Sequence, residues 1–584
     1  MDQEHLNNLR HSCAHLLAAS VRSIWPSAQN AIGPSIEDGF YQDFDMGEVK
    51  ISEEDFEKIE NKMREVLKTW DTFAIQEVPV AQAKKDFAWN IYKSELIDEF
   101  AMQGKMITET KQGEFLDLCK GGHLEHPKDE IKHFKLMSVA GAYWRGSEKN
   151  KMLTRIYGTC FPTKDELQKH LTMLEEAKMR DHKKLGKELD LFTFSESVGK
   201  GLPLWTEKGA TIRRELERFI VDEELRRGYL HVRTPDIAKL DLYKKSGHYP
   251  HYKDSMYAPI KIDDEEFMLR PMTCPHHFEL YLRKPHSYRE LPVRIAELAQ
   301  LYRYEQSGEL SGLQRVRAFC LADAHIICAS EEQAVAEVGK ALDLIEYIAG
   351  VFGLVHGTEY WYRLSLGDRS NSEKYYKNDA GWEKAEDLLR KHLTARGSRF
   401  VEAPGEAAFY GPKVDIQMKN VNGKEDTAFT VQYDLCMPER FDLKYNAEDG
   451  TEKRAVVVHR SSIGAIERIM AFLIEHYAGA FPVWLSPVQV MLAPVSEKHV
   501  DGAKKLLEEF QRAGIRAAMD DADESIGKKV RNAAKQKIPY IVVVGDRELE
   551  GGEWTIRVRG VEEQLKMVKN EFIEKVKAEI RERR

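Results

Sequence analysis

Hydrophobic positions along the chain change their spacing at two points, and these changes divide it into regions. Residues 166–190 carry apolar side chains at helical spacing among dense charge, which predicts a long exposed helix joining two domains. A second helical pattern ends in the proline-punctuated segment 481–490. The expected division is 1–165, a linker helix over 166–190, then 191–481 and 482–584.

The region after residue 487 alternates between strand-like and helix-like segments. Apolar runs at 488–495 and 538–545 predict strands, while helical spacing predicts one helix that ends at Gly514 and another that runs through Arg531. This alternation favours a small α/β domain with a mostly parallel sheet. The periodicity alone indicates a stable domain and no particular function.

Between residues 205 and 480 the pattern is different. Long amphipathic helices alternate with strands rich in polar and aromatic residues, and several strands carry Arg or His at alternating positions. These charges share one face of a sheet and need a partner, because burying a lone charge is costly. The pattern predicts an α+β fold with an antiparallel sheet, one face of which holds an anionic ligand.

Composition narrows the class of protein. The 584 residues suffice for about four domains of ~150 residues, and 42% apolar content supports a folded core. No run of ~18 apolar residues exists, and acids and histidines precede the first apolar stretch, so neither a membrane span nor a signal peptide is expected. Seven scattered cysteines predict reduced thiols in a cytoplasmic protein. The net charge of −9 does not exclude nucleic acid, because a local basic face is enough to bind phosphate.

Several arginines form the first candidate site. Arg303, Arg315 and Arg317 flank a loop rich in Gly and Ser. A guanidinium group beside such a loop can donate two parallel hydrogen bonds to the oxygens of one phosphate. Phe319 offers a surface for stacking on a flat ring. The alternative is a surface hairpin with ordinary ion pairs. Arg468 lies near a predicted helix start, where a lone Arg is usually solvated.

Three segments together carry a family resemblance. They are 205–237, 302–319 and the helix that follows Gly464, and their order resembles motifs 1, 2 and 3 of class II aminoacyl-tRNA synthetases. The strings LWTEKGA, RPMTCP, DAHI and FYGPK resemble those of threonyl-tRNA synthetases. The resemblance implies a class II catalytic core with an antiparallel sheet, an N-terminal α+β editing domain and a C-terminal α/β anticodon-binding domain.

The resemblance also implies an activity. Members of this family attach threonine to its tRNA through threonyl adenylate, at the expense of ATP with Mg²⁺, and hydrolyse seryl-tRNA. Arg303, Arg315 and Arg468 are the implied catalytic residues, and motif 1 implies a homodimer. The implied contacts to ATP are Arg303, Glu305, Arg315, Phe319, Lys413, Thr430, Gln432 and Arg468.

A zinc site follows only from the resemblance. Cys274, His325 and His459 are far apart in sequence, and no local ligand spacing joins them, so the residues alone favour no site. They match the zinc ligands of threonyl-tRNA synthetases, which implies one Zn²⁺ per chain with an open position. Such a site grips the threonine hydroxyl, which valine lacks, whereas an apolar pocket separates these near isosteres only ~100-fold. Asp323, Tyr410 and Gln432 are the implied partners of threonine.

A second cluster lies near the N-terminus. His11 and His15 are one helical turn apart, and Cys119 and His123 add a thiol and an imidazole. By residue type this is either a zinc site or a set of packed histidines. The set resembles the editing site of threonyl-tRNA synthetases, which works without metal, and that of alanyl relatives, which bind zinc. Asp117, Lys93 and Tyr41 also match editing positions, and serine, lacking one methyl, requires such a site.

Three features complete the expectations. Glu550, Arg557 and Arg559 are the implied anticodon contacts, against a solvated strand edge as the alternative. The chain begins at the expected editing domain, without the extra small domain of many relatives. It departs from the family at Leu321 and Ala322, where relatives often carry Gln and Asp, and in an acidic run at 520–524. Rival interpretations are a class II ligase for serine or proline, a non-catalytic RNA-binding paralogue, and a stand-alone deacylase.

Overall fold

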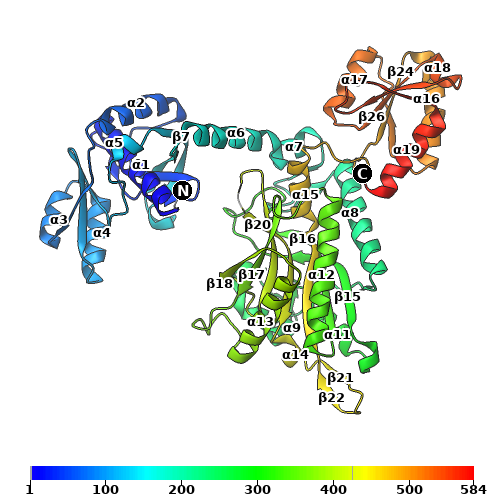
Figure 1. The fold of residues 1–584 in the computed structure, drawn as a ribbon, viewed down its shortest axis with the longest axis horizontal. Coiled ribbons are helices and arrows are strands. Elements are labelled where there is room, and N and C mark those ends of the chain that lie inside the picture. Colours follow the sequence, from blue (N-terminus) through cyan, green and yellow to red (C-terminus); the bar gives the residue numbers. More distant parts are fainter. Residues whose placement is uncertain (1–2, 424) are drawn as a thin grey trace. The chain divides into compact units, whose positions relative to one another are not determined.

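The structure, a computed structural model, describes residues 3–423 and 425–584, which divide into two compact units. Unit 1 ends at Glu175 and unit 2 begins at Glu176 (Figure 1). The boundary falls inside helix α6 (Lys164–Arg180), which is followed at once by α7 (His182–Glu188). The predicted linker helix is therefore interrupted, because the Asp181 carboxylate accepts bonds from the backbone N–H groups of Lys183 and Lys184 and starts a new helix.

Unit 1 consists of a long helix on a sheet, with a smaller sheet beside them. The buried face of α1 (Gln3–Ile24) includes Leu9, Cys13 and Leu17, and it packs on strands β3 and β8. The five-stranded sheet contains β1 (Gln29–Asn30), β2 (Ser35–Ile36), β3 (Gly39–Asp45), β7 (His133–Tyr143) and β8 (Met152–Phe161). The second sheet contains β4 (Ala74–Val78), β5 (Ile107–Gln112) and β6 (Phe115–Leu118). The remaining helices are α2 (Phe56–Leu67), α3 (Val80–Asp86), α4 (Ile91–Met102) and α5 (Pro127–Glu130).

An eight-stranded sheet is the centre of unit 2. Its strands pair antiparallel except for the outermost pair at each edge, which confirms the predicted antiparallel sheet. In spatial order they are β11 (Leu230–His231), β15 (Val293–Tyr302), β16 (Ala318–Cys328), β23 (Val456–Ala465), β20 (Glu425–Asp434), β19 (Lys413–Lys419), β17 (Tyr360–Leu366) and β18 (Phe400–Pro404).

Helices cover one face of this sheet. Ala324, Ile326 and Cys328 on β16 share the main core with α12 (Glu331–Val351) and α15 (Ile466–His476). Because side chains alternate along a strand, Asp323 and His325 project to the opposite face. That face carries the candidate site. The other helices of this part are α8 (Glu207–Arg226), α9 (Leu240–Ser246), α10 (His248–His251), α11 (Cys274–Leu282), α13 (Asp379–Ala395) and α14 (Met437–Arg440).

Three small sheets of two or three short strands accompany the large sheet. They are β9 (Phe192–Thr193) with β10 (Leu204–Trp205), β12 (Ile237–Lys239) and β13 (Ile260–Ile262) on either side of β14 (Glu265–Leu269), and β21 (Lys444–Asn446) with β22 (Glu452–Arg454). Among the described helices, none is long and apolar enough to span a bilayer.

The C-terminal part of unit 2 contains a mixed sheet. Strands β25 (Ala517–Met519), β24 (Val490–Pro494) and β26 (Tyr540–Val544) are parallel, but β27 (Trp554–Val558) and β28 (Leu565–Met567) are antiparallel. The expectation of a mostly parallel sheet is wrong for this half, because the links after β26 and β27 are too short for a crossover. The flanking helices are α16 (Val500–Arg512), α17 (Ile526–Lys535), α18 (Asp546–Leu549) and α19 (Lys569–Glu582).

Gly464, near the end of β23, gives a test of how tightly this sheet is built. Its φ is +70°, and a Cβ there lies 2.4 Å from the carbonyl oxygen of Ala428. We expect Gly464→Ala to destabilise the chain by ~2–4 kcal/mol, the sum of left-handed strain and overpacking, in denaturant unfolding followed by circular dichroism. Gly450 is the matched control, because its φ is +78° but a Cβ meets nothing within 4 Å. Equal losses in both variants would contradict the steric part.

Candidate functional site

The strand register brings the predicted residues of unit 2 into rows across the sheet. His325, His459, Gln432 and Lys413 lie directly opposite one another on β16, β23, β20 and β19. Two residues along, Asp323, Ser461, Thr430 and Asp415 form a second row on the same face. Residues as far apart in sequence as Asp323 and Ser461, which are separated by 138 positions, thereby meet at one place.

The members of these rows on β16, β23 and β20 line a cavity of about 260 Å³. Twelve of the predicted residues line it: Cys274, Arg303, Glu305, Arg315, Phe319, Asp323, His325, Tyr410, Thr430, Gln432, His459 and Arg468. Lys413 does not line the cavity. Its ammonium lies 2.9 Å from Asp415, which also accepts a bond from the Thr430 hydroxyl, so Lys413 reaches the site through that carboxylate.

Positive charge gathers at one end of this cavity. Among the described residues, neither Arg303 nor Arg468 forms an ion pair, and burial lowers the pKa of both. The Arg303 guanidinium lies 5.1 Å from the centroid of the Phe319 ring, and Arg468 donates to the backbone oxygens of Gln314 and Thr427. Arg315 lies 3.5 Å from Glu309. Cations that line a cavity without carboxylate partners favour an anionic ligand such as a polyphosphate.

A buried Cys–His–His cluster lies at the other end. Cys274 is the first residue of α11, and His325 and His459 face each other across β16 and β23 with ring centroids 4.6 Å apart. All three ligand atoms lie within 4.8 Å of one another. Burial raises the pKa of Cys274 and lowers that of His325, so without a cation both groups are held neutral.

The rings of this cluster are held by bonds at their far nitrogens. Nε2 of His459 lies 2.6 Å from Asp434, whose other oxygen accepts from the backbone of Cys436 and Met437. Nδ1 of His325 lies 2.8 Å from His277. The opposite nitrogen of each ring is thus left to bind a ligand. The sequence analysis missed both Asp434 and His277, because each acts on a ligand ring through a contact that only the fold creates.

Polar groups surround the space beside the cluster. Tyr410 stacks on His459 at 4.9 Å between centroids, and its hydroxyl donates to Gln432. Asp323 lies two residues before His325 on β16 and so on the same face, and burial raises the pKa of its carboxyl group. These groups suit a small ligand that carries both an amine and a hydroxyl. Leu321 also lines the cavity, whereas Ala322 is buried in the core behind the sheet.

Unit 1 contains a separate cavity of about 530 Å³. His11, His15, Lys93, Asp117 and Cys119 line it. The Cys119 thiol lies 3.5 Å from Nε2 of His11 and 3.1 Å from Nε2 of His123. The ligand atoms of the four His and Cys residues lie within 4.8 Å of one another, an arrangement that also has the dimensions of a metal site.

A buried carboxylate orders this second cavity. Asp117 lies 2.6 Å from the Lys93 ammonium and 3.2 Å from Nδ1 of His15, and it accepts a bond from Asn30. Burial opposes its ionisation, but the charges of Lys93 and His15 hold the pKa of Asp117 well below its usual range. Burial likewise opposes ionisation of Cys119, yet bonds from His11, His123 and His15 lower the pKa of its thiol to about 3.

Tyr41 does not join this cavity. Alternation along β3 turns it to the opposite face, where the Arg155 guanidinium lies 3.8 Å from its ring centroid. The neighbouring Gln42 is 2% exposed and lines the cavity instead. The sequence analysis missed Gln42, because a match to a motif does not report which of two adjacent strand residues faces inward.

The predicted anticodon residues divide into two kinds. Glu550 and Arg557 are exposed at the end of α18 and on β27. Arg559 is half-buried and donates to the backbone oxygens of Lys537 and Phe481. It therefore ties loops together in the structure and is not presented at an open surface.

Comparison with known proteins agrees with this geometry. Residues 257–477 match the tRNA synthetase class II core domain (G, H, P, S and T), and residues 489–579 match an anticodon binding domain. Residues 110–157 match the threonyl and alanyl tRNA synthetase second additional domain. The threonine--tRNA ligase of Anoxybacillus flavithermus is 48% identical over 99% of this chain and 89% of its own length. The chain belongs to the threonyl-tRNA synthetase family.

Solved structures support this assignment. The RNA binding domain of threonyl-tRNA synthetase from Cryptosporidium parvum is 35% identical, with a TM-score of 0.65, and the match covers 68% of this chain and 98% of that one. The prolyl-tRNA synthetase of the same organism is only 14% identical, with a TM-score of 0.51 over 69% of this chain and 75% of its own, and shares the fold alone. The prediction of a threonine–tRNA ligase with class II, anticodon-binding and editing-type domains is confirmed, against the rival ligase for serine or proline.

The low pKa of Cys119 in this threonyl-tRNA synthetase family member predicts an unusual pH profile. The thiolate is the reactive form, and with a pKa of about 3 it is fully formed above pH ~5. We expect alkylation of Cys119 by iodoacetamide to proceed at nearly the same rate from about pH 5 to pH 8. An ordinary thiol slows about tenfold per pH unit over that range. Mass spectrometry of the peptide that contains Cys119 provides the rate, and a tenfold slope there contradicts the lowered pKa.

Proposed function

We propose that the cavity of unit 2 activates threonine with ATP and then transfers it to the 3′-terminal ribose of tRNA. The observation that carries this proposal is the meeting of unpaired arginines and a buried Cys–His–His cluster in one cavity. In the first step, an oxygen of the threonine carboxylate attacks the α-phosphorus of ATP. The bond to the bridging oxygen breaks, and pyrophosphate leaves. In the second, the ribose hydroxyl attacks the carbonyl carbon of the adenylate, and AMP leaves.

Arginine side chains supply the charge that this chemistry needs. Arg303, 5.1 Å from the Phe319 ring, is assigned to the α-phosphate, where it stabilises negative charge that grows in the transition state. Phe319 and Glu305 are assigned to the adenine ring. Arg315 and Arg468 are assigned to the terminal phosphates with Mg²⁺, which neutralises them further. The Arg303 guanidinium already lies against Phe319, so little reorganisation of this charge accompanies the reaction.

The residues of the Cys–His–His cluster fit zinc. One thiolate and two imidazoles are preferred zinc ligands, and three protein ligands leave a fourth position open. Cys274, His325 and His459 would hold the zinc, which would supply a Lewis acid for recognition of the amino and hydroxyl groups of threonine. Asp323, Tyr410 and Gln432 accept or donate hydrogen bonds to the same groups. Valine offers no such oxygen, so this arrangement explains selection that shape alone does not provide.

The cavity of unit 1 is assigned to hydrolysis of seryl-tRNA. Serine differs from threonine by one methyl group, worth only ~1–3 kcal/mol in binding, so a second site is needed to remove it. His11, His15, Lys93, Asp117, Cys119 and His123 are the proposed editing residues. The ion pair of Lys93 and Asp117 positions the His15 imidazole. The histidines assist proton transfer as water attacks the ester carbonyl. Gln42 takes the place expected of Tyr41.

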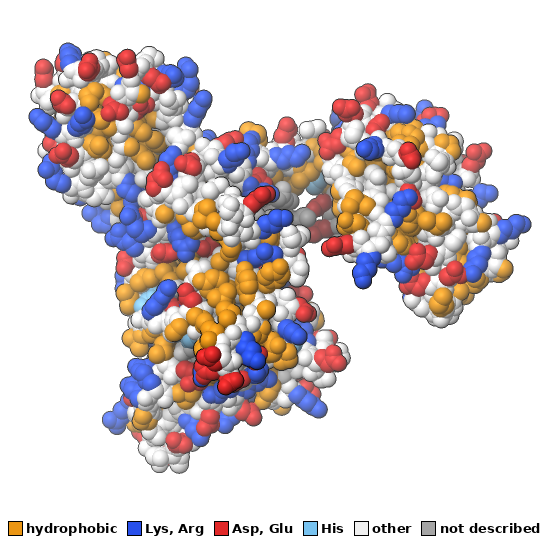
Figure 2. All heavy atoms as spheres, turned by 180° about the vertical axis from the view of Figure 1, so that it is seen from behind, with side chains coloured by type: hydrophobic (Ala, Val, Ile, Leu, Met, Phe, Trp, Pro, Cys, Tyr) orange, Lys and Arg blue, Asp and Glu red, His pale blue; other side chains and the backbone are white. Residues whose placement is uncertain are grey.

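Further assignments concern the rest of the chain. The proposed domains are editing (1–165), a linker (166–190), catalytic (191–481) and anticodon-binding (482–584), in a cytoplasmic protein. Arg557 and Glu550 are the proposed anticodon contacts. A homodimer is proposed through the motif 1 region, where Leu225, Leu230 and Ile237 are 41–59% exposed. Figure 2 shows hydrophobic side chains gathered over the middle of the visible face of the catalytic body.

The zinc assignment is tested by Cys274→Ala. We expect zinc content to fall from one per chain to none, since a structural thiolate ligand is lost, and threonine-dependent ATP–pyrophosphate exchange to disappear with it. Elemental analysis of the purified chain provides the first readout. Cys328→Ala is the matched control, because Cys328 is equally buried on β16 but faces the core away from the cavity. If Cys274→Ala holds as much zinc per chain as the wild type, this ligand set is ruled out.

The editing assignment is tested by His15→Ala. Loss of this imidazole removes a group that holds Asp117, and we expect hydrolysis of seryl-tRNA to slow by about 10²-fold or more while threonylation persists. The rate is measured on isolated seryl-tRNA. His126→Ala serves as the control, because His126 is exposed in the same unit and lies outside the cluster. If seryl-tRNA is cleared equally fast by the His15 variant, the hydrolytic site lies elsewhere.

A further inference from the structure

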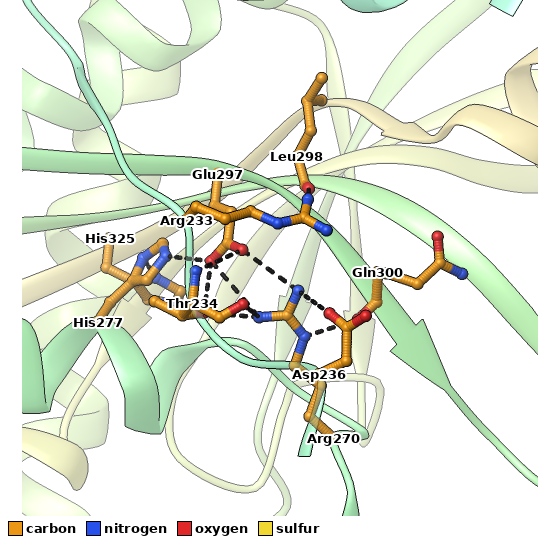
Figure 3. A network of polar contacts seen from close by, with 9 residues as sticks. All are labelled: Arg233, Thr234, Asp236, Arg270, His277, Glu297, Leu298, Gln300 and His325. Atoms are coloured by element: carbon orange, nitrogen blue, oxygen red, sulfur yellow. Dashed lines mark hydrogen bonds and ion pairs between the residues drawn. The ribbon is translucent and has the colours of Figure 1, made fainter. Parts of the chain in front are cut away.

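The two histidines of the proposed zinc site are held in different ways. His459 is bonded directly to the Asp434 carboxylate, but His325 is bonded to another imidazole, that of His277 (Figure 3). His277 continues to Glu297, whose Oε2 lies 3.3 Å from Nε2 of His277. A chain of three side chains on α11, β15 and β16 therefore leads away from the metal ligand. All three are at most 1% exposed.

Glu297 at the end of this chain is surrounded by donors. Oε1 accepts from the backbone N–H of Thr234 at 3.1 Å and from Nη2 of Arg270 at 3.2 Å, while Oε2 accepts from the Thr234 hydroxyl at 2.7 Å. Arg270 is itself fixed by the Gln300 backbone oxygen and by Asp236. Burial opposes ionisation, but bonds from His277 and Thr234 and the charge of Arg270 lower the pKa of Glu297 to about 2. It is therefore a carboxylate, which only accepts.

An acceptor at one end sets the direction of every bond in the chain. Nε2 of His277 must carry a proton that points to Glu297, and an imidazole with this single proton has a lone pair on Nδ1. Nδ1 of His325, 2.8 Å away, must then donate to that lone pair. Nε2 of His325 is left with its lone pair free. This is the form of imidazole that binds a metal ion.

We propose that Glu297, acting through His277, fixes the proton of His325 on Nδ1 and so holds Nε2 as the metal-binding atom. The inference rests on the zinc site proposed above and deepens it. Glu297 and His277 are positioning residues, since neither is one of the three proposed metal ligands and neither contacts the reacting atoms. Arg270 and Thr234 serve the relay by keeping Glu297 ionised and oriented.

The neighbouring His276 shows what a histidine without this role looks like. It lies on the same helix, is 8% exposed, and has no bonding partner at either ring nitrogen among the described residues. An imidazole on α11 can therefore be buried by packing alone, without hydrogen bonds that fix the position of its proton. The continuous bonding of His277 requires another explanation, which the relay provides.

The test measures zinc affinity of the full-length chain by competition with a chromogenic chelator. In His277→Phe the ring is kept but both bonds are lost, and we expect the zinc dissociation constant to rise about 10–100-fold, as loss of an outer partner of a metal ligand does. In His277→Asn, an amide oxygen near the former Nδ1 position accepts again from His325, and affinity recovers in part. His276→Phe, the matched control, keeps wild-type affinity. The absorption spectrum of the Co²⁺ form should change only in the His277 variants.

Each outcome decides the proposal. Wild-type affinity in His277→Phe, or an equal loss in His276→Phe, overturns the relay but leaves the zinc site standing. A wild-type chain that binds no zinc overturns both. If His277→Phe does not fold by circular dichroism, His277→Asn decides alone: weaker zinc binding than wild type supports the relay, and equal binding overturns it.

Discussion

Strand register is the constraint on which the catalytic unit depends. His325, His459 and Gln432 share one row because β16, β23 and β20 pair without a slip at that point. A shift of one residue turns every side chain of a strand to the other face, which would bury Asp323 in the apolar core beneath α12. The alternation of the apolar Ala324 and Ile326 with the polar Asp323 and His325 prevents this. Apolar packing behind the sheet thus determines the chemistry in front of it.

Both cavities use burial in the same way. Each collects charged or ionisable groups at a cavity from which water is partly excluded. In unit 2 the excess is positive, at Arg303 and Arg468, and it suits phosphate. In unit 1 a carboxylate and a thiolate are stabilised among His15, Lys93 and His11, which suits proton transfer and a polar reactant. Charges that would weaken a purely structural core are therefore the functional part of this chain.

Much of the architecture was predictable from periodicity, because amphipathic helices and alternating strands leave a strong local signal. The antiparallel sheet and the C-terminal α/β pattern were predicted in this way. The metal ligands were not, since Cys274, His325 and His459 meet only through long-range pairing, and only the family resemblance indicated them. Tyr41 was misplaced because adjacent strand residues differ by a half-turn that a motif does not encode. The break at Asp181 was missed because a capping side chain outcompeted a continuous helical pattern.

Leu321 has a consequence for selective inhibition. The family resemblance leads to an expectation of Gln at this position, whereas an apolar side chain lines the cavity beside Phe319. A compound that places a hydrocarbon group against Leu321 gains roughly 25 cal/mol for each Å² of apolar surface it removes from water. The same group desolvates an amide in a homologue that carries Gln there. One side chain on the wall of the cavity thus provides a chemical handle for distinguishing this enzyme from others of its family.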